Sequence, residues 1–217
     1  MAKEIRLHAN LTPRQKEVLR SKSYHHILTG PAGTAKTYTA LARGLKLLWD
    51  KRVERIVIIR SAVATRSIGF LPGDEADKLD VFTAPYVAIL NDLSPKFGYK
   101  ALESSKHVEF HSTSFLRGMT FERSCIVLDE YQNLSGHELE TAVTRVGEHT
   151  HLILCGDSDQ TDLTNAESRE HKRIIRVLTS MEDFHVHEFT TDDIVRSDFV
   201  KRYFQTKSRL EGSSPHE

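Results

Sequence analysis

Short runs of aliphatic and β-branched residues alternate along the chain with longer stretches of helical character. Five runs are expected to form strands: HHILTG (25–30), RIVIIR (55–60), SCIVLDE (124–130), THLILCGD (150–157) and FHVHEFT (184–190). Four stretches are expected to form helices: 37–49, 74–90, 135–146 and 166–181. Strands that alternate with helices are typical of a doubly wound, mainly parallel α/β sheet flanked by helices, which is the fold class we expect.

Two of the strand runs are apolar without alternation, at Ile56–Ile59 and Ile126–Leu128. This pattern indicates strands that are covered on both faces of the sheet. Ser135 is followed three residues later by Glu138. The pair predicts a capping box at the start of the third helix.

The chain of 217 residues, 39% of them hydrophobic, is long enough for one sizeable core. We expect a single domain over residues 1–210, with a helical excursion around 67–105, and a disordered tail over 211–217. No apolar stretch reaches the length of a membrane span, and the start of the chain does not resemble a secretory signal. Cys125 and Cys155 lie inside strand runs, so buried thiols and a cytoplasmic location are expected.

Charge is unevenly distributed, although the net charge is zero. Residues 1–66 contain 14 Lys and Arg against 4 Asp and Glu, whereas residues 67–217 contain 16 against 26. The basic third is compatible with an anionic ligand or a nucleic acid. It is equally compatible with two oppositely charged faces that attract each other in an assembly.

The stretch ILTGPAGTAKTYTALA (27–42) resembles a phosphate-binding loop between a strand and a helix. In such a loop, backbone N–H groups surround an anion at the helix N-terminus. Lys36 would then reach the β- and γ-phosphates of ATP, and Thr37 would be a ligand of Mg²⁺. The nucleotide-binding candidates here are Gly30, Pro31, Ala32, Gly33, Thr34, Ala35, Lys36, Thr37 and Tyr38.

Ala35 occupies the position where the phosphate-loop pattern has its second glycine. Its methyl group is tolerated if the local φ is negative and costly if φ is positive. The loop is therefore expected to bind ATP, with some distortion at this position.

Acidic residues follow two later strands. Asp129 and Glu130 end the run CIVLDE, 93 residues after Lys36, where Asp129 would hold the Mg²⁺ shell and Glu130 would polarise the attacking water. Asp157 and Gln160 follow the next strand, and Gln160 could contact the γ-phosphate or the water. The alternatives are a helix cap for the acidic pair and an ordinary Asp-rich turn for GDSDQ.

Eight segments, in order from about residue 11 to 204, together resemble the PhoH family of phosphate-starvation-associated ATPases. They are LTPRQKEVL, GPAGTAKT, GFLPGDEADKLD, LRGMTF, VLDEYQNLS, TRVG, GDSDQTDL and DDIVRSDFV. The resemblance implies a P-loop fold similar to the RecA-like core of superfamily 1 helicases. It also implies an ATPase that needs Mg²⁺ and is coupled to single-stranded RNA or DNA.

The resemblance implies further roles. Gln15 matches a glutamine that reads the adenine edge, and Arg196 matches an arginine that could stabilise charge on the transferring phosphoryl group. Arg60, Arg66 and Arg117 become candidates for contacts with the nucleic-acid backbone. Plainer alternatives are surface arginines on a loop for Arg60 and Arg66, an ion pair with Asp192 or Asp193 for Arg196, and a helix-start residue for Gln15.

This sequence departs from the family pattern at Ala35, at Tyr131 in place of alanine, at Ser61 in place of proline and over residues 197–199. The change after Arg60 puts the nucleic-acid contacts in doubt. The short chain and the variant loops suggest a phage-encoded member.

The length suffices for one RecA-like lobe, so an arginine acting in trans requires a neighbouring subunit. Arg145 and Arg196 are the candidates, and the family resemblance implies a hexameric ring. The alternative function is a ring-forming ATP-dependent switch, or an NTPase coupled to a protein partner. The pairs His149/His151 and His185/His187 could each share a strand face, but no third ligand completes a metal-binding spacing in sequence.

Overall fold

The computed structural model describes residues 5–61, 75–157 and 163–211. Its centre is a six-stranded sheet in the order β3-β2-β4-β5-β1-β6, with every neighbouring pair parallel. The strands are β1 (His25–Thr29), β2 (Arg55–Arg60), β3 (Val108–Ser112), β4 (Ser124–Asp129), β5 (His151–Gly156) and β6 (Phe184–Glu188). Because all six run in one direction, their carboxyl ends meet at one edge of the sheet.

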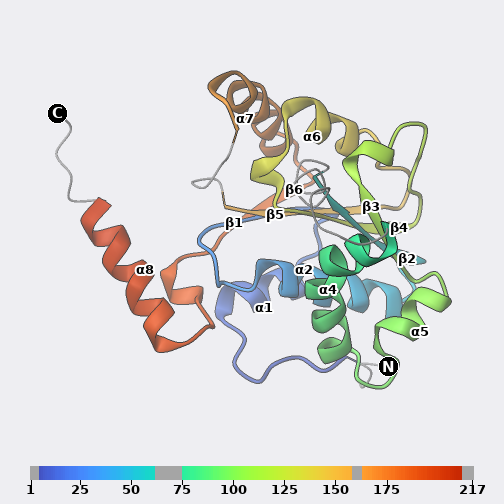
Figure 1. The fold of residues 1–217 in the computed structure, drawn as a ribbon, viewed down its shortest axis with the longest axis horizontal. Helices are drawn as coiled ribbons and strands as arrows, with labels where there is room; N and C mark the ends of the chain where they lie inside the picture. The colour runs from blue at the N-terminus through green and yellow to red at the C-terminus, as the bar shows by residue number, and fades with distance from the viewer. Residues whose placement is uncertain (1–4, 62–74, 158–162, 212–217) are drawn as a thin grey trace.

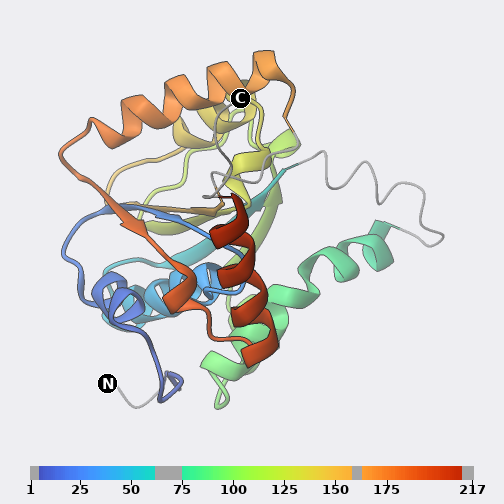
Figure 2. The ribbon, with the colours of Figure 1, turned by 90° about the vertical axis from the view of Figure 1, so that its left-hand side faces the viewer.

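Helices cover both faces of this sheet (Figure 1). One face carries α1 (Pro13–Arg20), α2 (Lys36–Trp49), α4 (Glu75–Leu93) and α5 (Gly98–Ser104), and the other carries α6 (Gly136–Val143) and α7 (Asn165–Thr179). Figure 2 shows the same two layers from the side. The last helix, α8 (Asp198–Glu211), extends away from the sheet.

The apolar strands divide their side chains between two cores. Ile56 and Ile58 of β2 pack in the core beneath α2 and α4, whereas Val57 and Ile59 pack in the core beneath α6 and α7. Burial on both faces explains why the strand showed no hydrophobic alternation. The expectation of strands covered on both sides is confirmed.

The expected fold class is confirmed, as are all five expected strands and four helices, with ends shifted by a few residues. Ser135 and Glu138 form the expected capping box. Strand β3 was not anticipated, because this edge strand is only partly buried and has no apolar run. Helix α5 lies within the helical excursion expected around 67–105, and α1 was anticipated only through the alternative of a helix start at Gln15. Helix α8 was not anticipated, and Glu211 ends it rather than beginning a tail.

Both cysteines are buried and unpaired, as expected. Among the described residues, no helix has both the length and the apolar character that a membrane crossing would require.

Candidate active site

The loop from Gly30 to Ala35 connects β1 to the N-terminus of α2 and has an unusual backbone. Gly30 has a φ of 134°, and a Cβ atom there would lie 2.1 Å from the carbonyl oxygen of Phe189. A side chain at this position is therefore excluded both by conformation and by space. The segment after β6 is thus packed directly against the start of the loop.

Ala35 is the N-cap of α2 and has φ 59° and ψ 38°, in the left-handed region. For alanine this conformation costs roughly 1–2 kcal/mol compared with the right-handed region. The loop nevertheless takes the turn that a glycine would make. Of the two cases considered from the sequence, the structure therefore has the positive φ at Ala35. The folding of the surrounding elements offsets its free-energy cost.

Lys36 is held by the loop that precedes it. Its ammonium group donates hydrogen bonds to the carbonyl oxygens of Gly30 at 2.6 Å and Pro31 at 2.9 Å. Burial lowers the pKa of Lys36, while the nearby charges of Asp157 and Glu130 act in the opposite direction. The cation therefore lies at the N-terminus of α2, where anions bind.

Asp129, at the end of β4, receives two side-chain hydrogen bonds. The Thr37 hydroxyl donates to its Oδ1 atom at 2.9 Å, and the Tyr86 hydroxyl of α4 donates to its Oδ2 atom at 2.8 Å. Burial raises the pKa of Asp129 and the charge of Glu130 adds to this, whereas the two hydrogen bonds and the charge of Arg60 lower it. A hydroxyl and a carboxylate oxygen side by side are the ligands that Mg²⁺ prefers, so the residues fit this ion.

Glu130 follows Asp129 in a left-handed conformation, with φ 53° and ψ 42°. This turn directs the chain out of β4 into the short helix η2 (Tyr131–Asn133). The Gln132 amide donates to Glu130 Oε2 at 2.6 Å, and Gln132 Oε1 accepts from the backbone N–H of Asp157 at 3.1 Å. Gln132 therefore connects the carboxylate of Glu130 to the end of β5.

Tyr131, where the family pattern has alanine, is buried and stacks on His171 of α7 with ring centroids 5.8 Å apart. Gly156 makes room for this arrangement. A Cβ at Gly156 would lie 2.2 Å from Gln132 Oε1 and 2.7 Å from the Tyr131 ring. Tyr131, which is larger than the alanine of the family pattern, thus fits because Gly156, the last residue of β5, has no side chain.

These groups share one cavity of about 420 Å³ at the carboxyl edge of the sheet. It is lined by Ala32, Gly33, Ala35, Lys36, Thr37, Tyr38, Ile89, Asp129, Glu130, Gln132, Gly156, Asp157, Val195 and Arg196. A second cavity of about 610 Å³ shares Ala35, Tyr38 and Val195 with the first, and also contains Leu11 and His8. In the cavity of about 420 Å³, the side chains of Lys36 and Arg196 and the N-terminus of α2 are groups that a polyphosphate can bind. The adjoining cavity of about 610 Å³ is large enough for a nucleoside.

Arg196 lies against the phosphate loop of its own chain. A Cβ at Gly33 would be 3.5 Å from the Cγ and Cδ atoms of Arg196, and the backbone N–H of Val195 donates to the Gly33 carbonyl at 3.1 Å. In the described part of the chain, Arg196 has no ion pair with Asp192 or Asp193. The alternative considered from the sequence, an ion pair of Arg196 with one of these aspartates, is therefore not present among the residues that the structure describes.

Gln15 is completely buried and contacts the loop from α1. Its amide nitrogen donates to the Thr34 carbonyl at 3.0 Å, and its Oε1 accepts from the Thr12 backbone N–H at 3.0 Å in a capping box. The motif TPRQ thus begins helix α1 and also provides the hydrogen bond from Gln15 to the phosphate loop.

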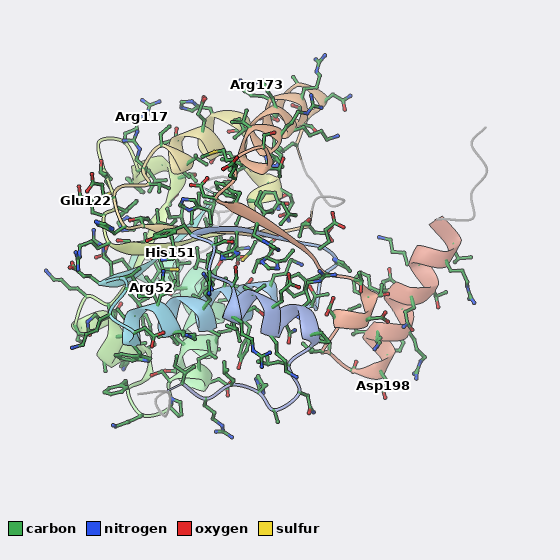
Figure 3. All side chains as sticks on the ribbon, turned by 180° about the vertical axis from the view of Figure 1, so that it is seen from behind. Arg52, Arg117, Glu122, His151, Arg173 and Asp198 are labelled. Carbon is green, nitrogen blue, oxygen red and sulfur yellow. The ribbon has the colours of Figure 1, made fainter. Side chains whose placement is uncertain are left out.

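The other arginine candidates lie in different surroundings. Arg60 ends β2 near Asp129 and Tyr86, on whose pKa its charge acts. Arg117 is exposed on the side of the molecule occupied by α6 and α7, far from Asp198 at the start of α8 (Figure 3). Arg145 donates to the Met119 carbonyl at 3.1 Å.

Two candidates, Arg66 and Gln160, lie outside the described residues. Their predicted roles therefore remain predictions from the sequence.

Glu138 has a role that its capping box alone did not reveal. Its Oε1 atom accepts from Thr113 at 2.7 Å and from Ser61 at 3.3 Å, while Oε2 accepts from the Ser135 hydroxyl at 2.9 Å. One carboxylate thus joins the ends of β2 and β3 to the start of α6. Ser61, a departure from the family pattern, contributes a hydrogen bond that proline could not make.

The protein-family model described as "PhoH-like protein" matches residues 9–207. This chain belongs to the PhoH family. It is 33% identical over 183 residues to a PhoH-like protein of Mycobacterium tuberculosis (strain ATCC 25618 / H37Rv), covering 84% of this chain and 52% of the relative. It is 31% identical over 208 residues to a PhoH-like protein of Synechocystis sp., covering 94% of this chain and 63% of the relative. It is 32% identical over 177 residues to Protein PhoH of Escherichia coli K12, covering 80% of this chain and 50% of the relative. The chain therefore spans about half to two thirds of these relatives' length.

Among solved structures, the chain is similar to the Sulfolobus solfataricus SWI2/SNF2 ATPase core in complex with dsDNA. The TM-score is 0.52 at 14% identity, covering 87% of this chain and 46% of the other. With its parallel sheet and loop-to-helix connection after β1, this PhoH-family chain has the RecA-like P-loop NTPase fold. Fold and family together support a nucleotide-binding NTPase.

Proposed function

We propose that this PhoH-family chain is a Mg²⁺-dependent ATPase. The observation that carries the proposal is the 2.9 Å hydrogen bond from Thr37 to Asp129, beside Lys36 and Glu130 in one cavity. A phosphate cradle, a pair of oxygen ligands and a second carboxylate are the parts that phosphoryl transfer to water requires.

Each residue has one task in this proposal. The N–H groups at the start of α2 and the Lys36 ammonium bind the phosphates, and Thr37 and Asp129 hold Mg²⁺, which neutralises charge on the phosphate oxygens. Glu130, oriented by Gln132, accepts a proton from the attacking water. Arg196 acts on the phosphates in cis.

The adjoining cavity binds the nucleoside. Tyr38 and Leu11 supply apolar surface there, and Gln15 lines the same space while it holds Thr34. The family resemblance of the motif TPRQ implied adenine recognition by Gln15. We retain this role for it together with positioning of the loop.

Nucleotide binding tests the first step. Lys36→Ala should weaken ATP binding in the presence of Mg²⁺ by at least about tenfold, because a charge-assisted contact is lost. Lys46→Ala is the matched control, since Lys46 lies on the same helix in an exposed pair with Asp50 and should leave affinity unchanged. Equal affinity of the native protein and Lys36→Ala would place the nucleotide elsewhere.

We further propose that single-stranded RNA or DNA is the coupled partner. Phe115, in the short helix η1 (Thr113–Phe115), is 73% exposed, and Arg117 lies two residues away on the surface. An exposed aromatic ring beside a cation is the combination on which bases stack and phosphates pair. Arg60, the last residue of β2, remains a candidate for contacts with the nucleic-acid backbone, as does Arg66, which lies outside the described residues.

The test is ATP turnover at low salt, with and without each type of single strand. Phe115→Ala and Arg117→Ala should reduce stimulation, with strand binding about tenfold weaker, because stacking contributes about 1–3 kcal/mol per base. Val177→Ala, a change at another exposed apolar side chain, should have no effect. Stimulation that is unchanged in both variants would exclude this surface and favour a protein partner.

The proposed assembly is a ring, for which a hexamer is the expected size. Helix α8 extends from the body and exposes Phe199 (71%), Tyr203 (57%) and Leu210 (65%) at spacings that share one helix face. A second copy of the chain would cover this face, and Arg145 is the remaining candidate for a trans arginine. Light scattering should give a multiple of 24.7 kDa that falls in the double variant Phe199→Ser/Tyr203→Ser. A native monomer with full turnover would exclude the ring.

A further inference from the structure

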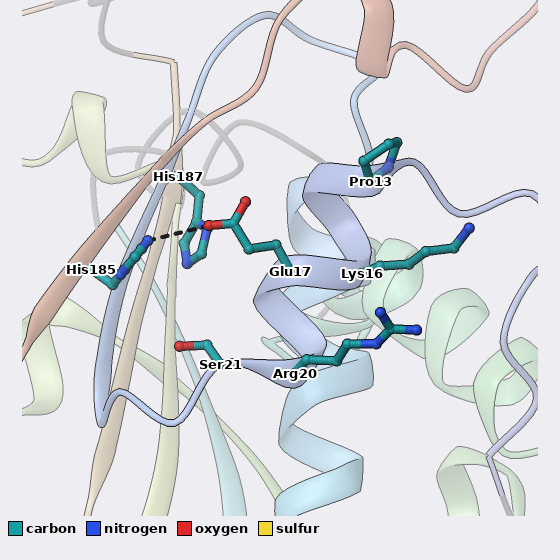
Figure 4. Close-up of a pocket in the computed structure, with 7 residues that line it drawn as sticks. All are labelled: Pro13, Lys16, Glu17, Arg20, Ser21, His185 and His187. Atoms are coloured by element: carbon teal, nitrogen blue, oxygen red, sulfur yellow. Dashed lines mark ion pairs between the residues drawn. The ribbon is translucent and has the colours of Figure 1, made fainter.

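A carboxylate and two imidazoles converge between helix α1 and the edge strand β6. The cavity there, about 590 Å³, is lined by Pro13, Lys16, Glu17, Arg20, Ser21, His185 and His187 (Figure 4). Among the described residues, it shares no lining residue with the two cavities of the proposed ATP site. The sequence pattern showed no third metal ligand beside His185 and His187 of β6. In the structure, Glu17 of α1 takes that place.

The spacing of the three donor atoms matches a small tetrahedral ion. Glu17 Oε1 lies 3.3 Å from His185 Nε2 and 3.4 Å from His187 Nδ1, and all three atoms are within 4.8 Å of one another. Ligands at about 2.0–2.1 Å from a tetrahedral Zn²⁺ are separated by about 3.3–3.4 Å. Two edges of the expected tetrahedron are thus present.

Hydrogen bonds behind His187 determine which of its nitrogens carries the proton. His26 Nε2 lies 3.1 Å from the Ser23 carbonyl, which can only accept, so this nitrogen carries a hydrogen. In a neutral imidazole the other ring nitrogen, here His26 Nδ1, is then an acceptor. That atom lies 3.1 Å from His187 Nε2, which must therefore be the donor.

Neutral His187 then directs the lone pair of Nδ1 toward the Glu17 carboxylate. Its side chain is fully buried, and within residues 5–61, 75–157 and 163–211 its Nδ1 atom makes no hydrogen bond. The Nδ1 lone pair and the half-exposed Glu17 carboxylate, 3.4 Å apart, repel each other unless a cation lies between them.

We propose that Glu17, His185 and His187 form a binding site for a divalent transition-metal ion, best suited to Zn²⁺. Two nitrogens and one carboxylate oxygen are a ligand set that zinc accepts, with the fourth position open to solvent. His26 is the outer partner that orients His187, as ligating histidines usually require. Lys16 and Arg20 extend from the opposite side of α1 and do not point at the three donor atoms (Figure 4).

The ion would join α1 to β6 across 168 residues of sequence. Helix α1 also carries Gln15, which holds the phosphate loop through Thr34. A bound ion would therefore restrain the helix that supports the nucleotide site. The proposed function of the ion is structural, and its binding can be measured without ATP.

The direct experiment titrates the full chain with Zn²⁺ alone by calorimetry, in a large excess of Mg²⁺ that occupies the ATP site. We expect one Zn²⁺ per chain, and at least about tenfold weaker binding in Glu17→Gln and in His185→Gln. Both side chains are about half exposed (46% and 47%), so the variants keep the fold. His149→Asn is the matched control, because His149 is exposed and its positive φ suits asparagine.

Co²⁺ provides a second readout, because its visible absorption depends on ligand number and geometry. The native protein should give the intense bands of a four-coordinate ion, and Glu17→Gln should not. Zn²⁺ should also raise the melting temperature of the native protein and of His149→Asn only. No Zn²⁺ binding by the native protein, or equal binding by both site variants, would overturn the proposal.

Discussion

The Tyr86 hydroxyl donates a 2.8 Å hydrogen bond to Oδ2 of Asp129, across 43 residues of sequence. Tyr86 is 1% exposed and comes from α4, whereas Asp129 ends β4. The bond fixes one carboxylate oxygen while Thr37 contacts the other. The proposed Mg²⁺ ligand is therefore oriented by a helix that carries none of the nucleotide motifs.

Tyr86→Phe should weaken Mg²⁺ binding, and more strongly at low pH. Loss of the hydroxyl removes a donor to ionised Asp129, so the pKa of Asp129, which burial already raises, moves further upward. Only the ionised carboxylate binds the metal, so the acid limb of the binding curve shifts to higher pH. The Mg²⁺ needed for ATP binding at pH 6 should rise about tenfold, since a hydrogen bond to a charged group contributes about 1.5–3 kcal/mol. Tyr99→Phe, which removes a hydroxyl bonded to Glu103, is the control. An unshifted pH profile would show that Tyr86 has no influence on the site.

Ala35→Gly should stabilise the protein without changing the site. The left-handed backbone at Ala35 costs about 1–2 kcal/mol for alanine and almost nothing for glycine. Glycine also loses more freedom on folding, so a net gain of roughly 0.5–1 kcal/mol in the free energy of unfolding is expected. Urea denaturation measures it, and ATP affinity should change by less than about tenfold. An affinity gain of several orders of magnitude would mean that the native loop is impaired.

Stability should fall as the pH drops below about 6.5, because three buried histidines stay neutral in the folded protein. Burial is the largest cause in each case, and it lowers the pKa of His26 to about 2 and those of His151 and His187 to about 4. The unfolded chain binds protons at these sites from about pH 6.5 downward, so the free energy of unfolding decreases with falling pH. At pH 5 each histidine contributes a loss of about 2 kcal/mol. Denaturation in EDTA at pH 7.5 and pH 5 tests this, and equal stabilities would contradict it.

Arg43 of α2 should be required for stability. Arg43 is 2% exposed, and its guanidinium group donates to three carbonyl oxygens at and just after the end of α1: Val18 (2.9 Å), Ser21 (3.0 Å) and Ser23 (2.8 Å). Arg43→Met would leave these carbonyls without their donor, at a cost of about 3 kcal/mol.

Arg52→Met is the comparison for this change, since Arg52 is exposed and only lies 6.0 Å from the ring of Tyr24. Chemical denaturation of both variants should show a loss below about 1 kcal/mol for Arg52→Met. Similar losses in the two variants would mean that the Arg43 hydrogen bonds do not hold α1 in place.

Structural features could be predicted from the sequence where a residue type or pattern has a single physical explanation. Gly30 and Lys36 define the loop, and the non-alternating strands require cover on both faces, so the fold and the centre of the candidate site could be predicted. The backbone at Ala35 could not, because a residue's φ depends on how the flanking elements hold it.

Contacts between distant segments were the main gap. Tyr86, Gln132 and Glu17 have no local signature, since their roles arise only when α4, η2 and α1 meet the sheet. Glu138 was predicted as a helix cap, but its bonds to Ser61 and Thr113 depend on β2 and β3 being neighbours. The edge strand β3 was missed because its partly buried residues lack an apolar run.

ATP turnover by the native protein and by Glu130→Gln, with and without Mg²⁺, tests the central claim most directly. Glu140→Gln is the control, because Glu140 is exposed on α6 and should not affect the rate. We predict Mg²⁺-dependent turnover that falls by at least about 100-fold in Glu130→Gln, as expected for loss of a general base, while ATP binding persists. Tight ATP binding without turnover by the native protein would contradict the account and identify an ATP-dependent switch.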